Sequence, residues 1–270
     1  MNHLIQLVDS KIYGKQDVIK NKYPVSLTIG NFDGVHLGHQ YLLQKLKQIS
    51  KQNEFIVVVT FDPHPFNYFH PETPKKLLLP LQERITHLLK HGADVVYVQK
   101  FEKSFAQLSA DDFCKYWLAF YFNIKNIFVG HDFCYGKERR GNFNHLLSFG
   151  KQYGWHVEQC APLLSEPNQL HPHSSSISSS AIRAFLEEGN IESANEFLAR
   201  LYSLSGTVVK GDQIGRKLGF PTANIETLDA FIPKFGVYIC YVEIDDSGQL
   251  LPAVMNCGKR PTHTSGLKLQ

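Results

Sequence analysis

The segment Phe55–Phe61 (FIVVVTF) constrains the fold more than any other stretch of the chain. It is continuously apolar and rich in β-branched residues, whereas a strand with one solvent-facing side alternates apolar and polar residues. It therefore predicts a strand that is buried on both faces. A parallel sheet that carries helices on both sides buries its strands in this way.

Strand patterns and helix patterns alternate along the first two thirds of the chain. The predicted strands are Val25–Gly30, Phe55–Phe61, Asp94–Val98, Asn126–Gly130 and Trp155–Cys160. Apolar residues recur at helical spacing between them, as in Leu81–His91. Ser109, with Asp112 three residues on, is a predicted helix cap, and the helix it opens carries an aromatic face of Phe113, Trp117 and Phe120. We predict a doubly wound parallel-sheet α/β domain, in which ligands bind at the carboxyl ends of the strands.

The pattern changes near Leu201. Ser203–Lys210, Gly236–Ile244 and Leu251–Cys257 are predicted strands, and Asp245–Gly248 (DDSG) is a turn signal between two of them. No amphipathic helix is evident after Ile191–Leu201. We therefore expect two domains, an α/β domain at residues 1–188 and a partial, barrel-like all-β domain at residues 189–270.

Composition excludes several classes of protein. With 270 residues, 43% of them hydrophobic, the chain has enough apolar material for one large or two modest domains. A net charge of +3 does not indicate a nucleic-acid surface. No stretch approaches 18 apolar residues, so no membrane span is predicted. The five cysteines are odd in number and form no C-x-x-C pair, which predicts reduced thiols in a cytoplasmic protein.

The loop Gly30–Gln40 (GNFDGVHLGHQ) follows the first predicted strand and leads into a helix. Its glycines let the backbone approach a ligand closely, and the free N–H groups at the helix start attract anions. His36 and His39 are close enough to contact one anion from two directions, as transfer at phosphorus requires. A tight turn with two incidental histidines is the alternative. The strand before the loop, the helix after it and Asp33–Gly34 in the turn favour a phosphate site.

Five motifs, in this order, resemble those of bacterial bifunctional riboflavin kinase/FAD synthetases. They are TIGNFDGVHLGHQ (28–40), TFDPHP (60–65), VGHDFCYGKERRGN (129–142), ISSSAIR (177–183) and GDQIGRKLGFPTAN (211–224). The resemblance covers nearly the whole chain. It implies a first module that converts FMN and ATP to FAD and pyrophosphate, and a second module that phosphorylates riboflavin to FMN with ATP. It also implies that both modules use Mg²⁺.

The resemblance implies roles for individual residues of the first module. His36, His39 and Arg183 are the predicted catalytic residues. The predicted ligand-binding residues are Gly30, Asn31, Phe32, Asp33, Gly38, Asp62, His64, Asp132, Ser179 and Ser180.

The residues themselves leave alternatives open for several of these positions. Ser179 and Ser180 at a helix start, with Arg183 in the first turn, form either a second anion site or an ordinary cap with a surface arginine. Asp62 and His64 either face the flavin or a metal, or belong to a proline-rigid loop. Asp132 either lies near the nucleotide or caps a turn.

In the second domain, Gly211 and Gly215 belong to a glycine-rich flap. The resemblance implies that Thr222 and Asn224 hold the Mg²⁺–nucleotide complex, and hard oxygen ligands suit this ion. A β-turn is the alternative interpretation of the same residues. The family's kinase module continues with further barrel strands and a catalytic glutamate, whereas this sequence stops at Gln270. We therefore expect an incomplete kinase module with impaired activity.

Three other functions fit the sequence less well. A nucleotidylyltransferase for another phosphorylated acceptor, such as a pantetheine or polyol phosphate, is disfavoured by the kinase-like second domain. An aminoacyl-tRNA synthetase is disfavoured by the absence of a K-M-S-K-S loop. A nucleotide- or flavin-binding protein without turnover is disfavoured by the presence of His36, His39 and Arg183 together. We expect ATP, FMN, riboflavin and FAD as small-molecule partners, with no nucleic acid and no membrane. The sequence carries no indication of the oligomeric state.

Overall fold

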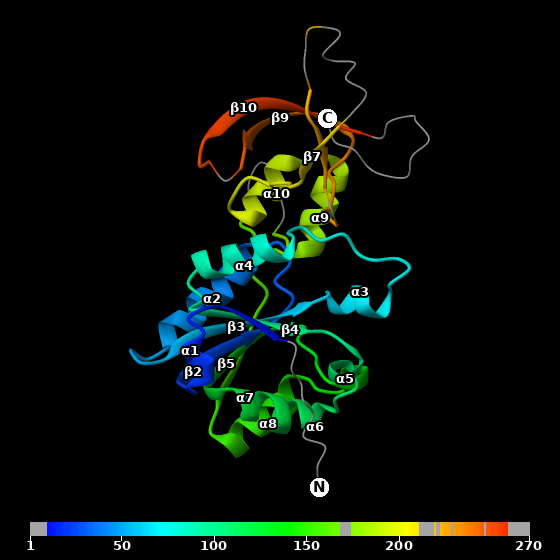
Figure 1. The fold of residues 1–270 in the computed structure, drawn as a ribbon. Coiled ribbons are helices and arrows are strands. Elements are labelled where there is room, and N and C mark those ends of the chain that lie inside the picture. Colours follow the sequence, from blue (N-terminus) through cyan, green and yellow to red (C-terminus); the bar gives the residue numbers. More distant parts are fainter. Residues whose placement is uncertain are drawn as a thin grey trace. The chain divides into compact units, whose positions relative to one another are not determined.

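The computed structural model describes residues 10–167, 174–210, 219, 222–227, 229–245 and 247–258. By its internal contacts the chain divides into two compact units (Figure 1). Unit 1 comprises Met1–Lys75 and Pro80–Ser178, and unit 2 comprises Lys76–Leu79 and Ser179–Gln270. This division falls before the predicted domain boundary at residue 188, which stays a prediction.

Unit 1 is built on one six-stranded sheet. Its strands are β1 (Ser10–Gly14), β2 (Pro24–Ile29), β3 (Phe55–Asp62), β4 (Val95–Lys100), β5 (Asn123–Gly130) and β6 (His156–Cys160). They lie in the order β1-β4-β3-β2-β5-β6. Strand β1 is antiparallel to β4, and the other neighbours are parallel. The five strands predicted in this part of the chain are therefore confirmed, with β3 buried along its apolar run.

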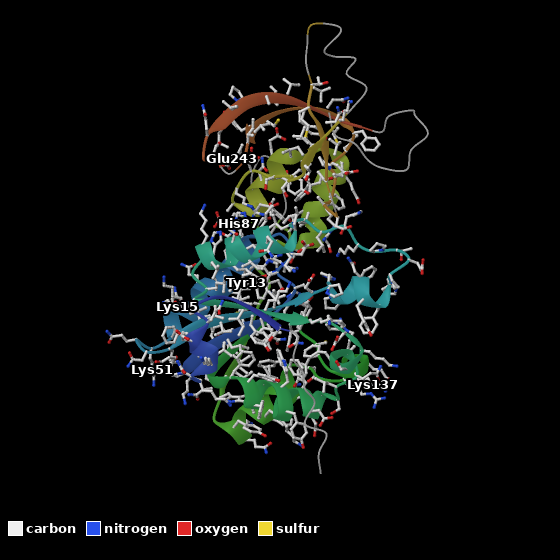
Figure 2. The ribbon with its side chains drawn as sticks, in the orientation of Figure 1. Tyr13, Lys15, Lys51, His87, Lys137 and Glu243 are labelled. Carbon is white, nitrogen blue, oxygen red and sulfur yellow. The ribbon has the colours of Figure 1, made fainter. Side chains whose placement is uncertain are left out.

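Strand β1 was not predicted from the sequence. It is short, and none of its residues is fully buried, so it lacks the apolar run that marks the other strands. Gly14 ends it with a φ of 86°, and a Cβ there would lie 2.3 Å from the Asp94 carbonyl oxygen. The next residue, Lys15, pairs with the Asp94 carboxylate at 2.7 Å. Figure 2 labels Tyr13 and Lys15, the residues before and after this glycine in the sequence.

The chain order of the strands reverses at β2. Strands β3 and β4 lie on one side of β2, and β5 and β6 lie on the other. In open α/β sheets the crevice outside the carboxyl ends of the strands at such a switch point is where ligands bind. The loops that follow β2 and β5, residues 30–39 and 131–142, both begin at this edge.

Helices cover both faces of the sheet. In unit 1 they are α1 (Asp17–Lys20), α2 (Leu37–Ile49), α3 (Pro65–Phe69), α4 (Leu81–Lys90), α5 (Lys103–Ala106), α6 (Ala110–Asp112), the π-helix η1 (Phe113–Leu118), α7 (Ala119–Tyr121), the 3-10 helix η2 (Lys137–Arg139) and α8 (Phe143–Tyr153). Figure 1 shows α2 and α4 on one side of the sheet and α7 and α8 on the other. In the part of the chain that the structure describes, no helix combines the length and apolar character needed to cross a membrane.

The π-helix changes the aromatic face that the sequence predicts. Ser109 caps the segment as expected, because its Oγ accepts the N–H of Asp112 at 3.0 Å. Phe113 and Trp117 are buried, but Phe120 is half exposed. A π-helical turn holds more residues than an α-helical turn, so the position of later side chains around the axis shifts. The prediction that Phe120 shares one helical face with Phe113 and Trp117 is therefore wrong.

Unit 2 combines two helices with short antiparallel sheets. Its elements are α9 (Ser179–Glu188), α10 (Ile191–Leu198), β7 (Thr207–Val209), β8 (Asn224–Glu226), β9 (Gly236–Glu243) and β10 (Leu250–Cys257). Strand β7 pairs with β8, and β9 pairs with β10. The predicted strand Ser203–Lys210 is shorter than expected. The chain reverses between β9 and β10, where the turn was predicted, and Asp246 of that turn lies outside the described residues. The fold class predicted from the sequence, an α/β domain followed by an all-β module, is confirmed.

Candidate functional site

The segment from the end of β2 into the first turn of α2, residues 30–39, is called the 30–39 loop, and it turns sharply at the carboxyl edge of the sheet. Gly30 extends the strand, because its N–H donates to the Val59 carbonyl at 3.1 Å. The φ angle is then positive at Phe32 (50°), Gly34 (84°) and Val35 (41°). Glycine adopts such angles freely, whereas a β-branched residue such as Val35 is strained there. Strain of this kind persists only where the surrounding structure imposes it, and it is concentrated at functional sites.

Two histidine rings stack at the start of α2. His36 is the N-cap residue, and its carbonyl accepts the N–H groups of His39 at 2.8 Å and Gln40 at 3.0 Å. The ring centroids of His36 and His39 are 3.7 Å apart and their planes differ by 21°. The predicted pair of imidazoles therefore lies together at the positive end of a helix, where an anion is favoured.

His39 is held in its neutral form. Burial lowers the pKa of His39 well below its ordinary value of 6.5, and the neighbouring His36 and Arg84 side chains lower it further. The Phe32 ring packs against it with centroids 5.1 Å apart. At neutral pH the His39 side chain is therefore an uncharged imidazole with one hydrogen-bond donor.

Gly38 leaves the space that the His36 ring occupies. A Cβ at residue 38 would lie 3.1 Å from both Cε1 and Nδ1 of His36 and 3.3 Å from the Ile177 carbonyl oxygen. These distances are shorter than ordinary contacts of a Cβ atom. The glycine in the H-x-G-H motif is therefore explained by packing and not by an unusual φ angle.

The other predicted residues of unit 1 follow adjacent strands of the sheet. Asp33 is buried within the 30–39 loop, Asp62 is exposed at the end of β3, and Asp132 is exposed after β5. His64 is the N-cap of α3, where its Nδ1 accepts the N–H of Phe66 at 3.1 Å. This histidine therefore has a structural role, and its predicted contact with flavin or metal stays a prediction.

One buried cation at this edge of the sheet was not predicted. The Arg84 side chain extends from α4 and is 1% exposed. Its Nη1 donates to the Asn31 carbonyl at 3.0 Å, and its Nη2 donates to the Phe61 carbonyl at 3.1 Å. A charged residue beside an apolar helical stripe predicts a surface position. The local sequence carries no signal that two carbonyl groups from distant segments converge on it.

The remaining residues predicted for the first module lie in unit 2. Ser179 and Ser180 are the first two residues of α9, so Arg183 is the fifth and lies just beyond the first turn in which it was expected. Arg183 is 7% exposed, and its Nη1 donates to the Ser179 carbonyl at 3.1 Å. Its Nε and Nη2 donate to the Lys76 carbonyl at 3.3 and 3.2 Å. The planar donor set of Arg183 thus binds backbone carbonyls here, and its contact with ATP stays a prediction.

Two of the four residues predicted to bind nucleotide in the kinase module lie among the described residues. Asn224 is buried at the first position of β8, and Thr222 is exposed two residues earlier. Gly211 and Gly215 of the predicted flap lie outside the described residues.

Unit 1 also has a surface hollow of about 390 Å³ between α6 and the 131–142 loop. Lys137, labelled in Figure 2, is one of its lining residues. The Tyr135 hydroxyl lies 3.3 Å from Cys114 Sγ and 2.7 Å from His145 Nδ1, and His145 Nε2 lies 3.0 Å from Asp111 Oδ1. Burial raises the pKa of the Cys114 thiol to about 11 and also raises that of Tyr135. Cys114 and Tyr135 therefore stay un-ionised at neutral pH, and their hydrogen bonds suit a role in fixing the loop.

Both parts of the chain match known protein families. Residues 18–180 match the family model of FAD synthetase, and residues 198–269 match that of riboflavin kinase. A bifunctional riboflavin kinase/FMN adenylyltransferase of Buchnera aphidicola subsp. Schizaphis graminum is 37% identical over 90% of this chain and 76% of its own length. The chain belongs to this bifunctional family. The resemblance inferred from the five motifs is therefore confirmed, and the 30–39 loop lies in the FAD synthetase part.

Other bifunctional riboflavin kinase/FMN adenylyltransferases are similarly related. The Haemophilus influenzae enzyme is 38% identical over 88% of this chain and 75% of its own length, and the Escherichia coli K12 enzyme is 37% identical over 90% and 75%. The chain spans about three quarters of the length of these relatives. A crystal structure of a protein named macrolide-efflux protein from Streptococcus pneumoniae matches with a TM-score of 0.75 and 27% identity. The match covers 95% of this chain and 82% of the Streptococcus pneumoniae chain.

Proposed function

We propose that unit 1 transfers the adenylyl group of ATP to FMN, giving FAD and pyrophosphate, and that the 30–39 loop is the centre of this reaction. The observation that carries the proposal is the stacked pair of His36 and His39 at the start of α2. It lies at the carboxyl edge of a parallel sheet, within the part of the chain that matches the FAD synthetase family.

The reaction forms one bond and breaks one bond at the α-phosphorus of ATP. A phosphate oxygen of FMN attacks this phosphorus, and the bond to the bridging oxygen of pyrophosphate breaks. The attacking phosphate is already an anion, so no general base is needed. The protein has to hold the two phosphate groups in line and to stabilise the charge that develops on the oxygens.

The 30–39 loop supplies groups suited to that task. The imidazoles of His36 and His39 provide hydrogen-bond donors to phosphate oxygens, and the first turn of α2 adds backbone N–H groups and the positive end of the helix dipole. His39 is neutral before substrate binds, so a nearby phosphate raises its pKa towards the ordinary value and strengthens the charge-assisted hydrogen bond.

Further residues are proposed to contact the substrates. Gly30, Asn31, Phe32, Asp33 and Gly38 belong to the same 30–39 loop as the two histidines, and Phe32 packs against the His39 ring. Asp62, His64 and Asp132 follow neighbouring strands at the same edge of the sheet, and we keep them as contacts of the flavin or nucleotide. Ser179, Ser180 and Arg183 stay predicted contacts of the ATP phosphates.

The family's second activity is the ATP-dependent phosphorylation of riboflavin to FMN, and residues 198–269 match that module. We propose that Thr222 and Asn224 bind the nucleotide and its Mg²⁺ there. Their hydroxyl and amide oxygens are the hard donors that Mg²⁺ prefers, and this ion commonly takes only one or two protein ligands beside the phosphates. When bound, Mg²⁺ neutralises charge on the transferring phosphate. The predicted impairment of this step stays a prediction, as does the cytoplasmic location.

The experiment that tests the adenylyl transfer is a product assay. The protein is incubated with FMN, ATP and Mg²⁺, and the flavins are separated by chromatography while pyrophosphate is measured by a coupled assay. Equal amounts of FAD and pyrophosphate are expected. Hydrolysis of ATP to AMP without FAD would contradict the proposal, because the acceptor would then be water.

A further inference from the structure

Arg84 is an unusual residue to find inside the α/β unit. Its side chain is almost completely buried, although it carries a permanent positive charge. Burial of an ion is costly unless its hydrogen bonds are well satisfied, and an apolar residue of similar size is often at least as stabilising. A role in packing alone therefore does not explain an arginine at this position of α4.

The hydrogen bonds of Arg84 connect two neighbouring loops. Asn31 is the second residue after β2, and Phe61 is the penultimate residue of β3. Two nitrogens of one guanidinium group bind the carbonyls of these two residues, at 3.0 and 3.1 Å. The Thr60 hydroxyl also donates to the Asn31 carbonyl, at 3.2 Å. The planar fork therefore fixes the distance between the start of the 30–39 loop and the end of β3.

The hydrogen bonding of Arg84 is incomplete. Its Nε is buried and has no hydrogen-bond partner within the part of the chain that the structure describes. A buried donor without a partner costs stability, and each such group calls for an explanation. The incomplete bonding favours a role in activity over a role in stability.

The charge of Arg84 also acts on the residues of the site. The carboxylates of Asp33, from the 30–39 loop, and Asp62, from the end of β3, both interact favourably with it, while burial lowers the pKa of the guanidinium. Arg84 and His36 both disfavour a positive charge on His39. The guanidinium is therefore electrostatically coupled to the two carboxylates and to one of the two stacked histidines.

We propose that Arg84 is a positioning residue for adenylyl transfer. It holds the start of the 30–39 loop at a fixed distance from the end of β3, and its positive charge acts on His39. The inference rests on the proposed function, because the loop that Arg84 orients is the proposed reaction centre. Arg84 acts through Asn31, Phe61 and His39 and is not assigned a contact with substrate.

Two variants of Arg84 separate the effect of its planar hydrogen-bonding geometry from the effect of its positive charge. Arg84→Lys keeps the charge but cannot bind two carbonyls through a planar fork, and Arg84→Met keeps an unbranched stem without charge. We expect kcat for FAD formation to fall about tenfold or more in Arg84→Lys and about 10²-fold in Arg84→Met, because small displacements of reacting groups are costly. The KM values for ATP and FMN are expected to change less than kcat.

A second measurement reads the electrostatic effect in the ligand-free protein. The pKa of His39 is followed by NMR titration of its Cε1–H signal, which is assigned by its loss in His39→Gln. We expect the pKa to stay near the wild-type value in Arg84→Lys and to rise in Arg84→Met, because the nearby positive charge is removed. Lys90→Met removes an exposed cation from the same helix, and it is expected to change neither kcat nor the His39 pKa.

The outcomes distinguish this inference from the proposed function. If the wild-type protein makes no FAD, the proposed function fails, whereas the His39 titration still reports on Arg84. Wild-type kcat in a folded Arg84→Met variant would overturn the inference, as would a loss of kcat that only follows the loss of folded protein in circular dichroism. If Arg84→Met does not fold, Arg84→Lys carries the test, and wild-type kcat in that variant would overturn the role of the fork.

Discussion

Replacement of Gly38 by alanine should separate activity from stability. The added Cβ would lie 3.1 Å from the His36 ring and 3.3 Å from the Ile177 carbonyl oxygen, so the ring has to move by a few tenths of an ångström. That movement disturbs a stack in which the ring centroids of His36 and His39 are 3.7 Å apart. The substitution therefore acts directly on the groups that are proposed to hold the phosphate.

The expected change in stability is small because two terms oppose each other. Alanine in a helix is favoured over glycine by about 0.5–1 kcal/mol. A side chain forced about 30° from its preferred rotamer costs about 0.5–1.5 kcal/mol. We therefore expect the free energy of unfolding to change by less than about 1 kcal/mol, while kcat falls about 10- to 10²-fold because the donor is misplaced.

Gly92 provides the matched control. It follows α4, has a φ of 103°, and no atom lies within 4 Å of a Cβ built there. Gly92→Ala should cost about 1–2 kcal/mol of stability, because an L-residue is strained at positive φ, with kcat unchanged. Stability is measured by urea unfolding and kcat by chromatography of FAD. Unchanged kcat in Gly38→Ala, or equal losses of kcat in both variants, would refute the reasoning.

Four further predictions concern His39 and Arg183. His39→Ala is expected to lower kcat for FAD formation about 10²–10³-fold with a smaller change in KM, and steady-state kinetics with wild-type kcat would remove His39 from the mechanism. Arg183→Lys should raise the KM for ATP more than the KM for FMN. It should also lower the Tm, because lysine lacks the planar guanidinium group that binds the Lys76 carbonyl. Equal rises in both KM values would argue against a contact between Arg183 and ATP. ATP binding near pH 6 should take up a fraction of a proton, because the His39 pKa lies below 6.5 in the free protein and a bound phosphate raises it. Calorimetry in two buffers of different ionisation enthalpy measures this proton uptake. Undiminished uptake in His39→Asn would assign the proton to another group. By the same linkage, stability of the free protein should be full above about pH 6.5 and should fall as the pH drops below it, because the unfolded chain then binds more protons.

The strands and the main loop could be predicted from the sequence because their signals are local. The apolar run of β3, the glycines that follow β2 and the H-x-G-H spacing each lie within about ten residues. The same is true of the Ser109 cap, which the structure confirms. Strand β1 was missed because its pairing with β4 depends on residues about 85 positions away and not on its own composition.

Other features of the fold and the site could not be predicted from local sequence patterns. Arg84 has the pattern of a surface residue, and only the convergence of the Asn31 and Phe61 carbonyls accounts for its burial. The cap that His64 forms on α3 depends on the angle at which the chain leaves β3. The Phe120 side chain lies outside the buried face because η1 is a π-helix, and helical periodicity alone assumes a regular α-helix.

The most direct test of the central claim is a transfer experiment with labelled ATP. Wild-type protein is incubated with FMN, Mg²⁺ and ATP labelled at the α-phosphorus, with His39→Ala as the comparison. We predict that the label appears in FAD in a one-to-one ratio with the pyrophosphate released, and that the rate falls by about 10²–10³ in the variant. Label in AMP alone, or FAD formation at the same rate in both proteins, would contradict the assignment of adenylyl transfer to the 30–39 loop.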